Sequence, residues 1–346
     1  PYRKSAWRLR DIVDYGNTVA IAGMSHVAKY RTAWLENFYR IHADWVNRTA
    51  APYAFVVPSG QRDPYGTFEL LDILRTRDVE VHQAKSPFKA GGKDYPSGSW
   101  VIRTAQPSGA FAKTMLERQK YPDLRLYPGG PPKPPYDVTG HTLGMLMGVD
   151  VDQIDQPFEA QLQLVTDVHP AAPSFPPATS GWYLMSPSSN APFIAVARLQ
   201  AAKVPVFRAA GLGAIPDGTW IVAVSVDSTR ILQQVSQETG IEVRAIDAPV
   251  TGDVYRLKPG TRIGLWRGAN IMPAGWLKWL FEQYGFNHKA IASQDFARDL
   301  ASQYDAIVLP DGTSRNTIVN GLNRARHDAE WSWAYGVGEE GWTKLG

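Results

Sequence analysis

The sequence contains no cysteine. A disulfide framework, a zinc site built on thiolates and a cysteine nucleophile are therefore excluded for these 346 residues. The absence does not locate the protein, because exported and cytosolic chains can both lack cysteine.

Neither a charge excess nor a long apolar run is present. The 36 basic and 33 acidic side chains give a formal net charge of +3, which is too even to indicate a nucleic-acid or membrane-surface partner. No apolar run approaches the roughly 20 residues that span a bilayer, and proline interrupts the longest uncharged stretch, 170–197. We therefore expect no nucleic-acid partner and no membrane span.

Several motifs of catalysis and cofactor binding are also missing. No two of the seven histidines lie four residues apart, so the helical His-x-x-x-His zinc pair does not occur. A metal site assembled from distant residues stays open. The sequence also lacks a Walker A motif and the Gly-x-Ser-x-Gly elbow of hydrolases, and Gly211-Leu212-Gly213 has no third glycine.

What is present is a globular chain with irregular ends. Its 44% hydrophobic content is enough for a core, and its length predicts two or three domains at about 150 residues each. Residue 1 is Pro, and no signal-peptide pattern follows it. The last residues resemble the opening turn of a helix, so we expect a piece of a longer protein.

Periodicity predicts an α/β fold with an N-terminal helical segment. Apolar residues recur at three- and four-residue spacings over 5–48, with a break expected near Gly23 and Ser25. A strand-helix-strand-strand-helix pattern then occurs twice, which predicts an internal duplication; the alternative is that two unrelated α/β units look alike at this level. The predicted elements are 53–57, 65–77, 79–82, 95–102 and 109–119, then 182–185, 191–202, 204–207, 216–222 and 228–239.

A third pattern, strand-helix-strand-strand over 263–310, predicts the first half of a doubly wound, flavodoxin- or amidotransferase-like parallel sheet. The expected domains are a helical segment (1–50), a first α/β unit (51–150), a Pro-rich linker (151–180), a second α/β unit (181–258) and a partial doubly wound domain (259–346). The Pro-rich segment 127–136 is expected to form a strap on its own domain, the alternative being a ligand for an aromatic groove of a partner.

Two polar clusters follow predicted strands. Open α/β sheets place ligand loops at the carboxyl ends of strands, so Gln61, Arg62 and Asp63 are candidate ligand-binding residues, as are Asp311 and Arg315. In the competing interpretation Asp63 caps the helix that begins at Pro64, and Arg62 pairs locally. Trp331, Trp333 and Tyr335 suit either a sugar-stacking surface or packing.

The order of these segments resembles one family. Segments 7–15, 37–39, 57–64, 90–99, 106–113 and 134–149 are similar to the region downstream of the catalytic domain in large bacterial zinc carboxypeptidase-like proteins, of the carboxypeptidase A-type metallopeptidase family. Segments 275–286, 304–310 and 338–341 resemble the next domain of those proteins, a class I glutamine-amidotransferase-like domain.

The resemblance implies a parent hydrolase whose active site is elsewhere. The family's zinc ligands (a His-x-x-Glu pair and a later His), its general-base Glu and its substrate-binding Arg would all lie upstream of Pro1, and residues 5–28 would match only the last helix of the peptidase domain. No catalytic residue, metal ligand or cofactor is therefore assigned to this chain. Zinc is expected only in the upstream domain, and the family suggests a secreted or periplasmic location.

The resulting hypothesis is a non-catalytic C-terminal portion that supports the peptidase domain and shapes access to its cleft. The parent activity would be metal-dependent removal of C-terminal residues from peptides. One alternative is a peptide-, glycan- or peptidoglycan-binding module. Another is a degenerate enzyme that uses the loops at Arg62 and Arg315.

Overall fold

The computed structural model describes residues 7–134, 140–169, 173–213, 215–247, 250, 252–268, 271–312 and 314–320. Residue contacts divide the chain into two units, one of Pro1–Gln61 with Thr67–Val168 and one of Arg62–Gly66 with His169–Gly346. The fold is α/β, as the sequence predicts. The aromatic cluster at Trp331, Trp333 and Tyr335 lies outside the described residues.

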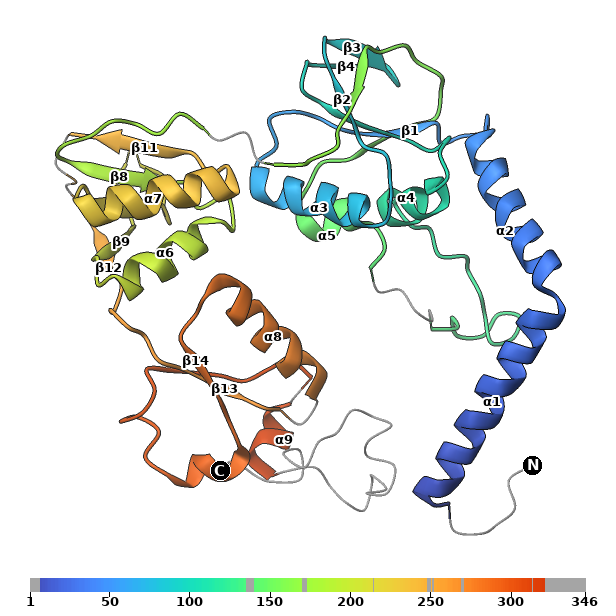
Figure 1. Cartoon of the computed structure of the whole chain (residues 1–346). Coiled ribbons are helices and arrows are strands. Elements are labelled where there is room, and N and C mark those ends of the chain that lie inside the picture. Colours follow the sequence, from blue (N-terminus) through green and yellow to red (C-terminus); the bar gives the residue numbers. More distant parts are fainter. Residues whose placement is uncertain are drawn as a thin grey trace. The chain divides into compact units, whose positions relative to one another are not determined.

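The N-terminal segment of the first unit is helical (Figure 1). Helix α1 spans Leu9–Lys29 and α2 spans Arg31–Val46. The break falls at Tyr30, whose N–H still donates to the carbonyl of His26 at 2.9 Å, and not at Gly23 and Ser25, which lie inside α1. Neither helix buries a single residue.

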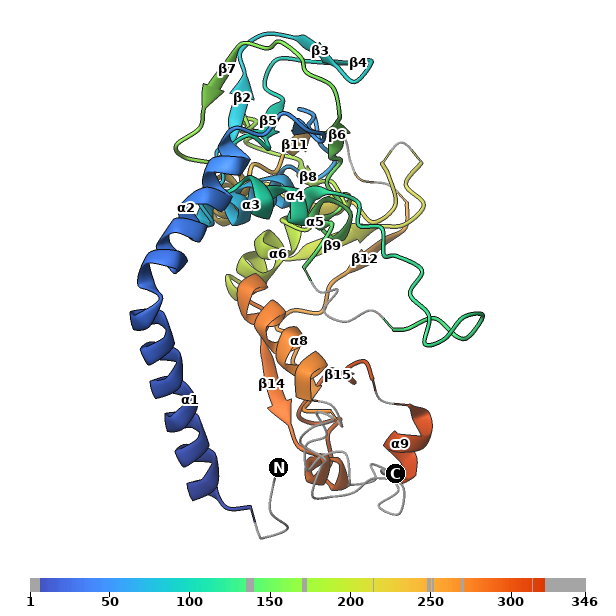
Figure 2. The same ribbon diagram turned by 90° about the vertical axis from the view of Figure 1, so that its right-hand side faces the viewer.

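The first unit also holds a five-stranded sheet of order β6-β1-β5-β2-β7, antiparallel throughout. Helices α3, α4 and α5 lie on one side of it and the β3–β4 hairpin on the other (Figures 1 and 2). The elements are β1 Ala54–Val57, α3 Pro64–Thr76, β2 His82–Ala84, β3 Phe88–Ala90, β4 Lys93–Tyr95, β5 Trp100–Arg103, α4 Gly109–Leu116, α5 Leu143–Met147, β6 Asp152–Ile154 and β7 Leu162–Leu164.

The second unit begins with a sheet of order β11-β8-β10-β9-β12, again antiparallel throughout. If the β3–β4 hairpin is left out and the strands of each sheet are counted in chain order, β8 corresponds to β1, β9 to β2, β10 to β5, β11 to β6 and β12 to β7. The two sheets then have the same strand order. The elements are β8 Trp182–Met185, α6 Pro192–Ala201, β9 Val206–Ala209, β10 Trp220–Ala223, α7 Val226–Thr239, β11 Val243–Ile246 and β12 Val254–Arg256.

Local geometry repeats as well. The turns before β5 and β10 share their hydrogen bonds: Gly98 N–H donates to Ala84 at 2.8 Å, and Gly218 N–H donates to Ala209 at 2.9 Å. These two glycines have φ of 85° and 83°, a left-handed conformation that glycine adopts at little cost. Shared strand order, register and turn geometry support the predicted duplication.

The predicted linker 151–180 is wrong in its first half, because β6 and β7 lie there and complete the first sheet by pairing with β1 and β2. Each of these strands has only three residues, too few for a clear alternation. The Pro-rich segment is not a packed strap in its described part. It folds on itself through a bridge between Arg125 and Pro132, with nearly all its side chains exposed.

The last part of the second unit is a parallel sheet, as predicted, and its strand order is β14-β13-β15. This is the order in which flavodoxin-like sheets begin. At the amino ends of the strands, both oxygens of Asp305 accept hydrogen bonds from Arg262, and Lys258 Nζ lies 2.6 Å from its Oδ1. The elements are β13 Ile263–Trp266, α8 Ile271–Tyr284, β14 His288–Ile291, a 3-10 turn Ser293–Ala297, β15 Ala306–Val308 and α9 Arg315–Asn320.

We expect Gly218→Ala to lower the free energy of unfolding by about 1–2 kcal/mol, because alanine pays a steric cost at this φ. Its Cβ would also lie 3.3 Å from atoms of Arg208 and Pro187. Gly275→Ala is the control, since Gly275 is in α8 with no atom within 4 Å of the added Cβ; this change should be neutral or slightly stabilising. Urea unfolding measures both, and an equal effect of the two substitutions would contradict the turn geometry.

Stability should also depend on pH through Asp305. Hydrogen bonds from Arg262, and then from Lys258, hold the pKa of this carboxyl well below its ordinary value. A depressed folded-state pKa gives stability that is complete above the unfolded pKa of about 3.9 and is lost as the pH falls below it. Thermal unfolding should therefore show a larger destabilisation by Asp305→Asn at pH 7 than at pH 3. The same loss at both pH values would disprove the linkage.

Candidate functional site

Gln61 follows β1 and fastens one loop to another. Its Nε2 donates to the carbonyls of Pro58 and Asp150, at 3.0 and 3.1 Å, and its Oε1 accepts from the Asp150 N–H at 2.9 Å. Because β6 runs antiparallel to β1, the loop that enters β6 lies beside the loop that leaves β1. The amide of Gln61 is thus fully engaged in holding these two loops together.

Asp63 caps helix α3, as the competing interpretation of the Gln61, Arg62 and Asp63 cluster expects. Its side chain is buried, and its Oδ1 accepts from the N–H of Gly66 at 3.2 Å, in the first turn of the helix that Pro64 begins. The same oxygen accepts from Ser189 Oγ at 2.7 Å, and Oδ2 accepts from the Asn190 N–H at 3.2 Å. The carboxylate therefore satisfies donors of the protein itself.

Arg62 is exposed, and the described residues offer it no hydrogen bond or ion pair, so it does not form the expected local pair. Asp311 and Arg315 are exposed too, and nothing in the described part of the chain joins them to each other or to the Arg62 cluster. Asp311 follows β15, at the carboxyl edge where β13 and β15 lie side by side. In this strand order, doubly wound sheets bind ligands at that edge. That Asp311 binds a ligand therefore stays a prediction.

The described residues contain no group of three or more His, Asp or Glu side chains placed to hold a metal ion. His82 on β2 is partly buried, and this burial lowers its pKa, against the opposing charge of Glu80 and with a smaller contribution from the charge of Arg103. No described helix is both long and apolar enough to cross a bilayer.

Two surfaces stand out that the polar motifs did not indicate. The first is the apolar surface of α1 and α2. Phe38 is 65% exposed and Trp34 is 53% exposed, although both are large apolar side chains. Other exposed apolar residues of these helices are Leu9, Ile12, Val13, Tyr15, Val19, Ile21, Met24, Val27, Leu35, Tyr39, Ile41 and Val46.

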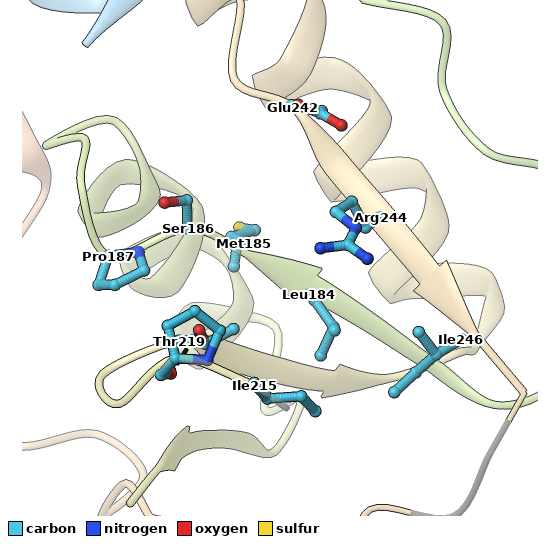
Figure 3. A pocket seen from close by; sticks show the side chains of 10 residues that line it. Leu184, Met185, Ser186, Pro187, Ile215, Thr219, Glu242, Arg244 and Ile246 are labelled. Atoms are coloured by element: carbon cyan, nitrogen blue, oxygen red, sulfur yellow. Dashed lines mark hydrogen bonds between the residues drawn. The ribbon is translucent and has the colours of Figure 1, made fainter. Parts of the chain in front are cut away.

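The second is a pocket of about 310 Å³ on the second antiparallel sheet, on the side away from α6 and α7 (Figure 3). Leu184, Ile215 and Ile246 line it with apolar surface. Arg244 extends from β11 toward Leu184 and Met185 on β8. Its remaining lining residues are Ser186, Pro187, Pro216, Thr219 and Glu242.

Arg244 is exposed and has no hydrogen-bond or ion-pair partner within the described ranges. Glu242, which directly precedes β11 and lies two residues before Arg244, is likewise exposed and unpaired within the described ranges. Sequence reasoning missed the site because it placed no strand between the helix at 228–239 and the third unit. The alternation of Val243 and Ala245, which face the helices, with Glu242, Arg244 and Ile246 was the available signal.

No protein-family model matches the chain, and neither the curated proteins nor the solved structures contain a match to it.

We expect Asp63→Ala to reduce the free energy of unfolding by about 1–3 kcal/mol, because it removes a helix cap and leaves the Ser189 hydroxyl without its acceptor. Arg62→Ala, one residue earlier and exposed, should change it by less than about 0.5 kcal/mol. Denaturant unfolding compares the two variants. If the arginine substitution proved the more damaging, Asp63 would not be the structural member of the pair.

Proposed function

We propose that this chain is a non-catalytic portion of a zinc carboxypeptidase-like protein, in which it supports the peptidase domain and shapes access to its cleft. The observation that carries the proposal is the uncovered apolar surface of α1 and α2. In the resembled family the segment matching α1 is the last helix of the peptidase domain, and such a helix is covered by that domain.

The energetics favour a covering partner. Full burial of a large apolar side chain contributes about 1.5–3 kcal/mol, and neither α1 nor α2 has a buried residue. In proteins, most of the stability of a helix comes from the packing of its apolar face and not from intrinsic helix propensity. A peptidase domain that covered this surface would stabilise both helices and fix the direction in which the chain leaves it.

In this proposal the peptidase domain binds zinc and the present chain does not. The zinc ligands and the general base would come from the peptidase domain, and the metal bound there would supply an activated water molecule for attack on the C-terminal peptide bond. Removal of C-terminal residues would thus be an activity of the whole protein.

A second candidate function is a peptide-, glycan- or peptidoglycan-binding module. The pocket at Arg244 favours it, because an apolar pocket with one unpaired cation suits a ligand that is partly apolar and anionic.

The test uses the 346-residue chain and the zinc peptidase domain that the proposal places upstream of Pro1. The chain alone should bind no stoichiometric zinc and should release no C-terminal residue from peptides. It should form a complex with the peptidase domain in a calorimetric titration. The double substitution Trp34→Ala/Phe38→Ala should weaken this complex at least about tenfold, since about 1.4 kcal/mol of lost burial suffices.

The matched control is Glu36→Ala, on the same helix and exposed, which should bind as the unmodified chain does. Circular dichroism of each variant verifies that helix content is retained. Failure to form a complex, equal binding by the double variant, or zinc-dependent peptidase activity of the chain alone would each refute the proposal.

A further inference from the structure

The first antiparallel sheet shows what covers the face that its helices leave open. The β3–β4 hairpin lies over that face, where Phe88 and Tyr95 pack with Val56, Val101 and other residues of the sheet. The rings of Phe88 and Tyr95 are stacked with their centroids 5.1 Å apart. An aromatic hairpin thus fills the outer side of the first sheet.

The hairpin is also held by charge. Lys93 Nζ lies 2.7 Å from Asp152 Oδ1, and the Tyr95 hydroxyl donates to Asp152 Oδ2 at 3.0 Å. Asp152 is the residue of edge strand β6 that pairs with Val56 of β1. The carboxylate at this register position therefore forms an ion pair with Lys93 and accepts a hydrogen bond from Tyr95, both of which belong to the covering hairpin.

The second sheet has the same register position but the opposite charge. Val57 pairs with Trp100 in the first sheet and Met185 pairs with Trp220 in the second, so Leu184 corresponds to Val56. Leu184 pairs with Arg244 of the edge strand β11. Arg244 thus stands where the first sheet has Asp152.

The segment that would cover this face is shorter in the second sheet. Residues 85–99 connect β2 to β5 and include the hairpin, whereas residues 210–219 connect β9 to β10 and contain no strand in their described part. Leu212 and Ile215 of this connection cover part of the face. The pocket is the part that they leave open.

From this comparison we infer that the Arg244 pocket binds a peptide segment presenting a carboxylate beside an aromatic side chain, seated on the sheet as the β3–β4 hairpin is seated on the first one. The carboxylate of the peptide pairs with Arg244, which has no partner among the described residues. This ion pair corresponds to that of Lys93 with Asp152 in the first sheet, with the positive and negative groups exchanged between sheet and covering segment. The aromatic ring lies on Leu184, Ile215 and Ile246. About 310 Å³ is at the lower end of the volumes typical of ligand pockets.

Glu242 limits the charge of the ligand. It lines the pocket on the same face as Arg244, so a second carboxylate near it would be repelled. The inference thus specifies one carboxylate. It uses no residue of α1 or α2, and it is therefore independent of the support of a peptidase domain.

The experiment is methyl NMR on the full chain labelled at isoleucine and leucine, because Leu184, Ile215 and Ile246 report directly from the pocket. The first probe is N-acetyl-Asp-Tyr-amide, whose carboxylate is a side chain, and the second is N-acetyltyrosine, whose carboxylate is a chain terminus. The uncharged comparison is N-acetyl-Asn-Tyr-amide. Saturable shifts of these three residues are expected with at least one charged probe and not with the uncharged one.

Arg244→Gln should weaken binding by about three- to tenfold, the scale of a partly exposed charged contact. Arg256→Gln is the matched control. Arg256 pairs with Phe207 and lies on the same face at the opposite edge of the sheet, outside the pocket, and its substitution should leave the affinity unchanged. Glu242→Gln should strengthen binding slightly, because it removes a like charge.

Binding by one charged probe alone identifies the source of the carboxylate and supports the inference. The inference is overturned if neither charged probe shifts the pocket methyls, if the uncharged probe binds equally well, or if Arg244→Gln binds as the unmodified chain does. None of these results depends on complex formation with a peptidase domain, so the two proposals fail separately.

Discussion

A sheet with two apolar faces needs cover on both, and this constraint governs the two antiparallel units. Alternate residues of the central strands point to opposite sides: Phe55 and Val57 pack with helices, whereas Ala54 and Val56 pack under the β3–β4 hairpin. The second sheet divides its residues in the same way. Among the described residues, its outer face has only loop residues for cover, and the pocket at Arg244 is the consequence.

The same requirement applies to the N-terminal helices. Helices α1 and α2 present apolar side chains over their whole length and bury none of them. Large exposed apolar surfaces mark places that contact another molecule or another part of the same protein. The proposed peptidase partner would supply that cover from outside the described residues, as the hairpin supplies it within the first sheet.

Sequence patterns predicted the elements that have a clear run of apolar residues between turns, and they failed for the shortest strands. Strands β8 and β13 lie where expected, because each is a largely buried run of four residues between clear turns. The edge strands β6 and β7 have three residues each, too few for an alternation that distinguishes a strand from a linker. Gln61, Arg62 and Asp63 were chosen by a rule for parallel sheets, but β1 has antiparallel neighbours, and Gln61 and Asp63 serve the loops and the helix start.

The sequence by itself determined the α/β class, the repeated order of elements and the left-handed turns at Gly98 and Gly218, because hydrophobic period and glycine placement are local properties of the chain. Only the tertiary structure decided which residue of one strand faces which residue of the next. That register places Arg244 where the other repeat has Asp152, and it depends on pairing between strands far apart in the chain. A charge reversal between two repeats with different loop lengths therefore becomes visible only once both sheets are formed.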